Sequence, residues 1–513
     1  MHTRIAEIVS VRPVIGLEVH VELATRSKMF SRSANPSHTT DTEPEPNTLT
    51  DPTVLGLPGA LPVMNLEAVE MSAAVGLALG CTIARFSKWD RKNYFYADMP
   101  KAYQISQYDL PLCAGGSVEI RGRSGAVRVG IIRAHLEEDA GKLLHEAPGG
   151  HAIDHSIVDL NRAGTPLLEI VTAPDFEHAE DVVAFCRWLR RVCVFLGVTR
   201  GVMQRGHIRF EPNINTELTL SDGSRVKTPI TEVKNLNSFK SVKGAIDHEV
   251  GRQPERWLAD GVVMGPGTKT TRGWDDDRER TVLQRDKEDA HEYRYFPDPD
   301  LPPVAIGEEW LGRIRGRVGE LPHVKEQRFV SEYGLSEKEA ATLTEEPETC
   351  RWYEACVAAT GVVGEGASSG GRAAANLLLQ NGLKRANERG VRVEALGITP
   401  QAIGGIARLR ESGAISAASV DELFGLLCDP SHTGREPEAL ARERGLLIVR
   451  DDEALRRWID EAVATHPKAA EDVRAGKVQA AGRLVGEVMK KAGAAADAKT
   501  VREAVLALLL PSA

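Results

Sequence analysis

The sequence predicts an α+β protein in which a mixed-sheet cradle domain is followed by an all-helical domain and a small helical tail domain. Across residues 13–303, short alternating or apolar runs are separated by Gly, Pro, Asn and Asp, which is typical of strand-rich folds. Beyond Trp310 the pattern changes to helical periodicity rich in Ala, Glu, Arg and Leu. The three domains are expected at residues 1–309, 310–428 and 429–513.

Length and charge limit the class of protein. The chain has 513 residues, enough for several domains, and its 64 Lys and Arg against 73 Asp and Glu give a net charge of −9. This charge excludes a uniformly basic nucleic-acid coat. The sequence lacks an uncharged apolar run of about 18 residues, as a membrane span needs, and it begins without the apolar core of a signal peptide. We therefore expect a cytoplasmic protein with no membrane partner.

Two helices stand out in the first domain. Residues 66–79 have Asn65 as a candidate N-cap and Gly80 just past the end, and residues 182–196 carry an apolar stripe that includes Cys186 and Cys193. The stripe favours core packing of these thiols over thiol chemistry. The seven cysteines form no C-x-x-C pair, so neither a disulfide framework nor a four-thiolate zinc site is predicted.

The run VIGLEVHVEL, residues 14–23, alternates strictly and predicts a half-buried strand. Its apolar side chains point to one face, and Glu18, His20 and Glu22 point to the other. Residues two apart on a strand are about 7 Å from each other, so a carboxylate and an imidazole can converge on one bound ion. A solvent-facing strand shows the same alternation, so the pattern alone leaves both interpretations open.

Other carboxylates interrupt segments that are otherwise apolar. Residues 125–142 run as a strand and end in His135, Glu137, Glu138 and Asp139, and Glu169 sits inside PLLEIV. A carboxylate in such a place is costly to bury unless it is paired or binds a metal. Oxygen ligands with one imidazole suit a hard divalent ion such as Mg²⁺, whereas structural salt bridges remain the alternative.

Aromatic and basic residues are concentrated in two segments. Six of the 26 aromatic residues lie in residues 89–108, together with Arg91, Lys92 and Lys101, and a second aromatic stretch covers residues 291–303. Such segments can stack bases and bind phosphate, or they can form the packed wall of a site. The tail also has six basic and three acidic residues across residues 468–491, which fits either a solvated helix face or an RNA contact. No GxxxxGK[ST] phosphate loop is present.

Several long motifs, in order along the chain, resemble the GatB family, the B subunits of the glutamyl/aspartyl-tRNA amidotransferases. The motifs are VIGLEVHVEL, LPGALPV, DRKNYFYADMPKAYQISQY, HLEEDAGK, DLNRAGTPLLEIV, EVKNLNSF and YRYFPDPDLPP. The stretch EDVRAGKVQAAGRLVGEVMKKAG resembles the helical tail domain that this family shares with small stand-alone proteins. The resemblance covers nearly the whole chain.

The resemblance implies a ligase that works as part of a heterotrimer with two partner subunits, the glutaminase GatA and the third subunit GatC. In this family the complex converts Glu-tRNA(Gln) to Gln-tRNA(Gln), or Asp-tRNA(Asn) to Asn-tRNA(Asn), with ATP, Mg²⁺ and glutamine as amide donor. The glutaminase releases ammonia, and GatB phosphorylates the side-chain carboxylate that ammonia then attacks. The resemblance does not distinguish the two misacylated tRNA substrates, and a non-catalytic tRNA-binding scaffold is the alternative function.

The resemblance also implies roles for particular residues. Four match the family's metal and nucleotide site, and two of these, Glu138 and His20, are expected to be catalytic; the expected metal ligands are Glu18, His20, Glu138 and Glu169. Lys92 and Lys101 match charged positions near the ammonia tunnel and the tRNA 3′ end, and we expect them to contact the cofactor ATP.

This chain departs from the family in several places. Some relatives carry paired cysteines before the LPG motif, whereas this chain has none there, so no zinc is predicted. Residues 211–215 read EPNIN where the family reads close to DANVS. The Gly-rich residues 360–376 are expected to be a linker or a loop, and Asn235 and Arg294 are expected near the site without an assigned role.

Overall fold

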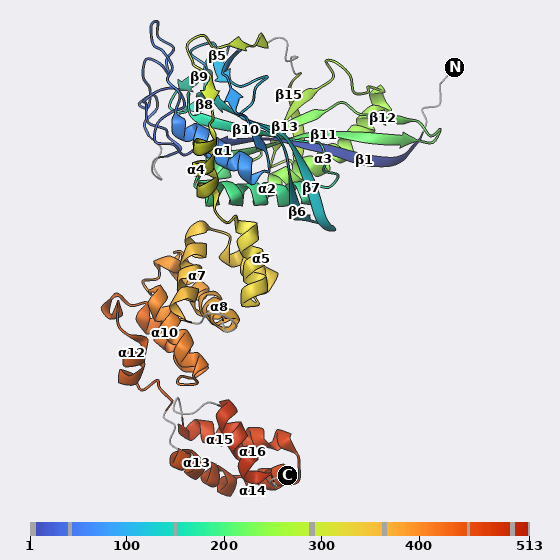
Figure 1. The fold of residues 1–513 in the computed structure, drawn as a ribbon. Helices are drawn as coiled ribbons and strands as arrows, with labels where there is room; N and C mark the ends of the chain where they lie inside the picture. Colours follow the sequence, from blue (N-terminus) through green and yellow to red (C-terminus); the bar gives the residue numbers. More distant parts are fainter. Residues whose placement is uncertain are drawn as a thin grey trace. The chain divides into compact units, whose positions relative to one another are not determined.

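The computed structural model describes residues 7–38, 44–147, 151–286, 293–361, 367–448, 452–492 and 498–510. The chain divides into two compact units, Met1–Leu321 and Pro322–Ala513 (Figure 1). The first unit contains a mixed sheet with helices, and the second is helical, so the predicted α+β class is confirmed. No helix in the described ranges is both long and apolar enough to cross a membrane.

A ten-stranded sheet organises the first unit. Its strands follow the order β15-β14-β13-β11-β1-β10-β7-β6-β2, with β12 paired to β11. Neighbours pair antiparallel except β13 and β14, which are parallel, so the sheet is mixed as predicted. The bounds are β1 Ile8–Glu22, β2 Thr82–Ile83, β6 Cys113–Gly122, β7 Gly125–Glu138, β10 Pro166–Thr172, β11 Ile208–Leu220, β12 Arg225–Lys227, β13 Thr231–Lys234, β14 Thr270–Asp275 and β15 Arg280–Asp286.

Helices cover the apolar face of this sheet (Figure 1). Leu17, Val19 and Val21 of β1 are almost fully buried, as the alternation of VIGLEVHVEL predicts, and they belong to the core that the helices complete. The same alternation turns the next side chains, those of Glu18, His20 and Glu22, to the opposite face. The helices are α1 Leu66–Ala78, α2 Ala179–Phe195, α3 Phe239–Asp260 and α4 Glu308–Val318.

Both helices predicted in the first domain are present. Asn65 caps α1, and its side chain accepts hydrogen bonds from the backbone N–H groups of Glu67 and Ala68. Gly80 follows the helix with φ +69°, a conformation that favours glycine. On α2, Cys186 and Cys193 are fully buried among apolar residues, and all seven cysteines of the chain are free and buried.

Small strand pairs cover one end of the sheet, and they join distant parts of the sequence. A three-stranded sheet has the order β16-β4-β5, and two pairs consist of β17 with β3 and β8 with β9. The bounds are β3 Phe86–Ser87, β4 Asp90–Asn93, β5 Tyr103–Ser106, β8 Lys142–Ala147, β9 His151–Asp159, β16 Phe296–Pro297 and β17 Val304–Ala305; a 3₁₀ turn covers Met203–Arg205.

The second unit is helical throughout its described elements, apart from isolated bridges and turns. Residues 362–366 of the Gly-rich stretch lie outside the described residues, and residues 367–376 form helix α8 rather than the expected linker or loop. The helices are α5 Pro322–Tyr333, α6 Glu337–Leu343, α7 Pro347–Ala359, α8 Ala367–Asn376, a π-helix Leu377–Gly382, α9 Leu383–Arg389, α10 Pro400–Glu411, α11 Ala417–Leu427, α12 Pro437–Glu443, α13 Asp452–Thr465, α14 Pro467–Arg474, α15 Ala481–Ala492 and α16 Ala498–Leu509; 3₁₀ turns cover Val393–Ala395, Pro430–His432 and Val478–Ala480.

The packing differs from the domain boundaries drawn from the sequence at two points. Helix α4, which contains Trp310, packs on α1, and the Trp310 indole N–H donates to Glu70 at 2.7 Å. Helix α12 packs on α10, and Leu447 forms a β-bridge with Ile415. The self-contained tail therefore begins at α13, beyond residue 448.

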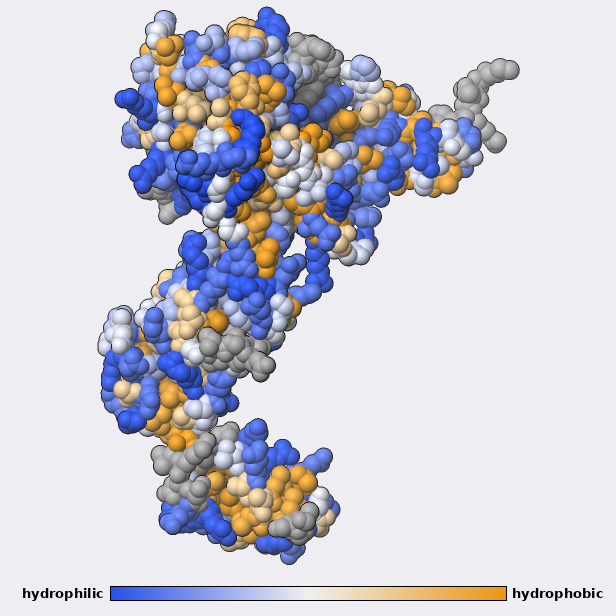
Figure 2. Space-filling model, viewed as in Figure 1, coloured by the Kyte–Doolittle hydropathy of each residue, from blue (hydrophilic) through white to orange (hydrophobic). Residues whose placement is uncertain are grey.

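The tail helices α13–α16 share a core of their own, which includes Leu484 and Val505. Figure 2 shows hydrophobic residues gathered over the middle of the tail, with hydrophilic residues along its margins. The shared core fits four short amphipathic helices that turn apolar stripes toward one another. The tail is therefore a separate packing unit within the helical half of the chain.

Candidate active site on the polar face of the sheet

Four neighbouring strands bring the predicted polar side chains to one face of the sheet. His20 of β1 lies opposite Arg209 of β11 on one side and opposite Glu169 of β10 on the other, and Glu169 lies opposite His135 of β7. Residues that face each other across antiparallel strands point to the same side. The register therefore assembles one row of charged and imidazole side chains from four distant segments.

The first cluster consists of His20, Glu137 and Glu169. The Nε2 atom of His20 lies 3.5 Å from Oε2 of Glu169 and 4.0 Å from Oε1 of Glu137, and His135 Nε2 lies 3.8 Å from the same Glu169 oxygen. One potential ligand atom from each of the three residues falls within 4.8 Å of the others. This spacing allows the imidazole and the two carboxylates to bind one ion together.

The electrostatic setting of the first cluster is strongly asymmetric. Burial lowers the pKa of His135 to about 4, so its ring is neutral near pH 7. Burial alone would raise the pKa of Glu169, but the facing imidazoles and the Lys92 ammonium outweigh it and hold that pKa well below its usual value. Burial alone would lower the pKa of His20, yet Glu211 and Glu169 raise it. The cluster thus combines an ionised carboxylate with an imidazole that carries a proton readily.

A second carboxylate cluster adjoins the first and consists of Glu18, Glu211 and Glu232. Lys234 Nζ lies 2.6 Å from Oε2 of Glu211 and 3.0 Å from Oε1 of Glu232. Burial opposes ionisation of Glu211, but His20 and Lys234 outweigh it and lower its pKa to about 2. His20 connects the clusters, because its Nδ1 atom lies 3.6 Å from Oε1 of Glu211.

The four residues expected as one metal site are divided by the structure. His20 and Glu169 lie together, Glu18 belongs to the neighbouring cluster, and Glu138 belongs to neither of the two groupings found among the described residues. Strand alternation turns Glu137 to the face of His20, whereas the Glu138 carboxylate pairs with Lys101 and accepts a hydrogen bond of 3.0 Å from Ile105 N.

Lys92 and Lys101 occupy two different surroundings. Lys92 lies beneath aromatic rings, 5.2 Å from the centroid of Tyr293 and 6.0 Å from that of Tyr94. Burial alone would lower the pKa of Lys92, but the facing carboxylates, Glu137 first among them, raise it above its usual value. Lys101 is buried beside Glu138. Lys92 therefore faces the first cluster, and Lys101 belongs to the Glu138 pair.

The two aromatic segments predicted separately form one wall beside this face. Strand β16 pairs with β4, and the rings of Tyr108 and Tyr295 stack with centroids 4.3 Å apart. Phe95 is 79% exposed and Tyr96 is 52% exposed, so the wall is partly packed and partly open to a ligand. Arg294, at φ +44°, belongs to the same wall, and Asn235, at φ +65°, directly follows Lys234. The left-handed conformation is strained for arginine, whereas asparagine adopts it readily.

Three residues of these clusters were given no role from the sequence: Glu137, Glu211 and Glu232. Glu137 could have been found from the alternation His135–Glu137 on one strand, which places both on the face of Glu169. Glu211 and Glu232 lie on β11 and β13, and their arrival beside Glu18 depends on strand pairing. Their sequence contexts, EPNIN and TEVKN, give no local sign of that pairing.

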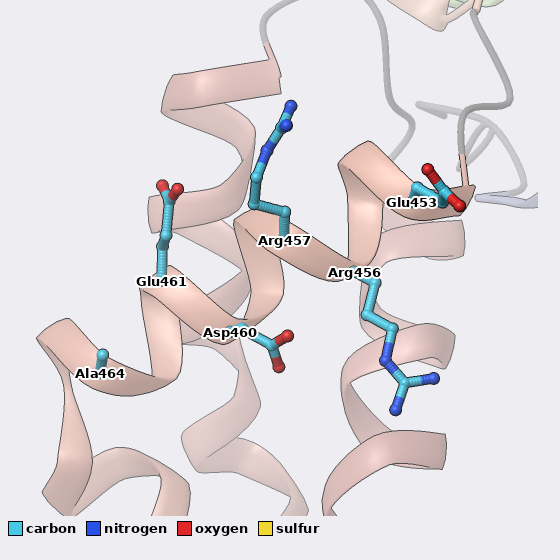
Figure 3. Close-up of a pocket in the computed structure, with 6 residues that line it drawn as sticks. All are labelled: Glu453, Arg456, Arg457, Asp460, Glu461 and Ala464. Atoms are coloured by element: carbon cyan, nitrogen blue, oxygen red, sulfur yellow. The ribbon is translucent and has the colours of Figure 1, made fainter.

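The tail has a hollow lined mostly by charged side chains of α13 (Figure 3). It is about 490 Å³ and lies along α13, where Arg457 and Glu461 project to one side and Arg456 and Asp460 to another. Its side chains have both signs of charge, and Glu461 pairs with Lys491 at 2.7 Å. This composition fits a hydrated binding surface, whereas the converging buried groups that catalysis needs lie on the sheet.

Comparisons with known proteins show what the two parts of the chain resemble. The family model described as the GatB/GatE catalytic domain matches residues 13–312, and the model described as the GatB domain matches residues 360–509. Proteins from Caldicellulosiruptor saccharolyticus and Thermomicrobium roseum are 41% and 44% identical over 493 and 490 residues. These alignments cover 96% and 95% of this chain and 97% and 96% of the relatives.

A protein from Rhodopirellula baltica is 40% identical over 502 residues, which is 97% of each chain. All three relatives are named as the B subunit of an aspartyl/glutamyl-tRNA(Asn/Gln) amidotransferase. With the two family models together spanning most of the sequence, the chain belongs to the GatB family, the B subunits of the tRNA-dependent amidotransferases.

Proposed function

We propose that this chain activates and amidates the side-chain carboxylate of glutamate or aspartate carried by misacylated tRNA(Gln) or tRNA(Asn). One observation carries the proposal: His20 links two adjacent carboxylate clusters, His20–Glu137–Glu169 and Glu18–Glu211–Glu232, on the buried polar face of one sheet. The names of the relatives support the tRNA substrate and the amide transfer. The two clusters support a site for ATP with its cation.

The donor set fits a hard divalent cation such as Mg²⁺. The two clusters together offer five carboxylates and one imidazole, and buried carboxylates are costly unless a cation or a positively charged side chain is close to them. Carboxylate oxygens with few nitrogen donors are the ligands that Mg²⁺ accepts beside phosphate. His20, Glu137 and Glu169 would hold one ion, and Glu18, Glu211 and Glu232 would hold a second one that neutralises charge on the phosphates.

The reaction needs ATP because a carboxylate is a poor acyl donor. A side-chain carboxylate oxygen attacks the γ-phosphorus of ATP, ADP leaves, and an acyl phosphate forms. Ammonia then attacks the acyl carbon, inorganic phosphate leaves, and the nitrogen loses a proton. A bound Mg²⁺ supplies neutralisation of charge on the phosphate oxygens. Lys92, which faces the first cluster, adds positive charge on the phosphoryl side.

We assign the Glu138–Lys101 pair to the ammonia step. Both side chains are buried at the end of β7, and Glu138 directly follows Glu137 of the first cluster. A buried carboxylate that is held by one ammonium group can accept the proton that the attacking nitrogen releases. In this assignment Glu138 is the catalytic base, and Lys101 positions it.

The proposal includes partners and separate tRNA contacts. Ammonia is supplied by a glutaminase subunit, and a third subunit completes the heterotrimer. The exposed Phe95 and Tyr96 stack on the 3′ end of the tRNA, and the basic residues of the tail contact its phosphates. In this assignment the sheet face binds the aminoacyl group and ATP.

The decisive experiment reconstitutes the heterotrimer with glutamine, ATP and Mg²⁺ and supplies Glu-tRNA(Gln) or Asp-tRNA(Asn) in turn. Correctly charged Gln-tRNA(Gln) is the matched control. The proposal predicts ADP formation and amide product with at least one misacylated tRNA, and neither with the control. Tight tRNA binding without ADP formation from either substrate would instead identify the chain as a non-catalytic scaffold.

A further inference from the structure

Two lysines adjoin the second carboxylate cluster, and they are held to it differently. Lys234 Nζ donates a hydrogen bond of 2.6 Å to Oε2 of Glu211 and lies 3.0 Å from Oε1 of Glu232. Lys269 Nζ lies 3.6 Å from Oε2 of Glu232 and 3.9 Å from Oε1 of Glu18, and both distances exceed the length of a hydrogen bond. Lys269 is therefore an electrostatic neighbour of the cluster rather than a hydrogen-bonded part of it.

The carboxylates of this cluster have other partners that keep them in place. The Asn213 side-chain N–H donates to Glu18 Oε1 at 2.9 Å, and Lys234 contacts the other two carboxylates. Lys269 directly precedes β14, and its side chain is 33% exposed. Because lysine has a flexible four-carbon stem, the ammonium group can turn to solvent. Departure of Lys269 would therefore leave the three carboxylates where they are.

The surroundings of the first cluster are different. Among the residues that the structure describes, no lysine lies within 4.0 Å of a carboxylate oxygen of Glu137 or Glu169. Arg133, whose side chain is 40% exposed, lies 4.0 Å from Glu169. The place for a cation between His20 and these two carboxylates is therefore open, whereas a loosely held ammonium group adjoins the corresponding place in the second cluster.

Formal charge decides what a second ion meets in each position of Lys269. With both lysines in place, the three carboxylates keep one uncompensated negative charge, so a divalent ion would leave the cluster with a net positive charge. Net charge of either sign is costly in a shielded site. With Lys269 turned away, the ion and Lys234 together balance the three carboxylates. The second ion and Lys269 therefore compete for the same carboxylates.

We propose that Lys269 holds the place of the second cation, so that this ion enters the Glu18–Glu211–Glu232 cluster only together with a nucleotide. The inference rests on the proposed function, which assigns the two ions, and it adds the order in which they bind. The first ion binds the free protein at its open cluster. The second arrives with the triphosphate, whose anionic oxygens give the displaced ammonium group of Lys269 a new partner.

The test counts bound Mn²⁺ by electron paramagnetic resonance, with the full-length chain in the assembled heterotrimer. Without nucleotide, Lys269→Gln removes the competing charge, so this variant should bind an additional Mn²⁺ ion at least about tenfold more tightly than the wild type does. With a saturating non-hydrolysable ATP analogue, the variant and the wild type should bind the same number of ions. Lys269→Arg keeps the charge and should behave as the wild type in both conditions.

Lys240→Gln is the matched control, since the Lys240 side chain is 89% exposed and pairs with Glu279 at 3.6 Å, outside both clusters. Equal Mn²⁺ binding by the wild type and Lys269→Gln without nucleotide would overturn the inference. If Lys269→Gln lowers the melting temperature, the wild type decides, and an equal ion count with and without the ATP analogue would overturn the inference. ADP formation with misacylated tRNA is measured in the same preparations, and its absence would contradict the proposed function whatever the ion count.

Discussion

The imidazole of His20 lies 3.5 Å from the Glu169 carboxylate, directly opposite it on the neighbouring strand. Their side chains are 13% and 12% exposed, so the pair is shielded but not sealed from solvent. A shielded pair next to two further carboxylates is arranged to bind an ion rather than to complete an apolar core. Substitutions of these groups should therefore affect ion binding more strongly than they affect the stability of the fold.

Glu137 and Glu138 should differ in their effects on cation binding. Glu137→Gln removes a carboxylate that faces His20, so Mn²⁺ affinity measured by calorimetry should fall at least about tenfold. Glu138→Gln, its matched neighbour, should leave Mn²⁺ affinity within about threefold, because that carboxylate pairs with Lys101. It should still abolish amide formation while tRNA affinity stays within a few fold. The reverse order of the two cation affinities would show that Glu138 is the ligand.

Cation affinity should rise with pH because His20 must lose its proton to bind an ion. Glu211 and Glu169 raise the pKa of His20 against the effect of burial. In the free protein, the charged imidazole stabilises the folded state fully below about pH 6.5, its unfolded pKa, and this contribution is lost as pH rises through the raised folded pKa. Ion affinity should increase over that same upper range. His20→Asn should remove this pH dependence in calorimetric titrations, and a pH dependence retained in His20→Asn would exclude His20 as the titrating ligand.

The exposed ring of Phe95 should contribute to binding of the tRNA end. Stacking of a base on an aromatic ring contributes about 1–3 kcal/mol, so Phe95→Ala should raise KM for misacylated tRNA by about fivefold or more. Folding should be unaffected because Phe95 is 79% exposed. Phe86→Ala is the control, since Phe86 is also exposed but lies on β3. Equal KM values for the two variants would show that the 3′ end of the tRNA does not stack on this wall.

Removal of the tail should weaken tRNA binding and leave the glutaminase partner active. The described tail helices have their own core, so truncation after residue 448 removes a whole packing unit. The expected loss comes from phosphate contacts, and it should therefore be larger at about 50 mM than at about 300 mM salt. Filter binding at both concentrations measures it, and glutamine hydrolysis is the control. Unchanged tRNA affinity at low salt would exclude the tail from the interface.

Much of the fold could be predicted because it depends on local patterns. The alternation of residues 14–23 identified the central strand and its polar face, and Asn65 with Gly80 marked both ends of α1. Glu169 stood out because a carboxylate within an apolar strand needs a partner. Each of these signals lies within a few residues of the feature it predicts.

The remaining part of the site depends on pairing between distant strands. Glu137 and Glu138 are adjacent on one strand, so their side chains point to opposite faces. Only the pairing of this strand with its neighbours shows which of the two faces His20. Glu211 and Glu232 reach Glu18 through β11 and β13, about two hundred residues along the chain. Tertiary packing also sets the start of the tail, because α12 packs with α10 although the sequence pattern changes earlier.

The ion and nucleotide positions can be tested together by an anomalous diffraction map of the heterotrimer soaked with Mn²⁺ and a non-hydrolysable ATP analogue. We expect a manganese peak among His20, Glu137 and Glu169, with the nucleotide phosphates beside Glu18 and Glu211. A manganese peak elsewhere, with these five side chains unchanged and no nucleotide density on this face of the sheet, would contradict the proposed site.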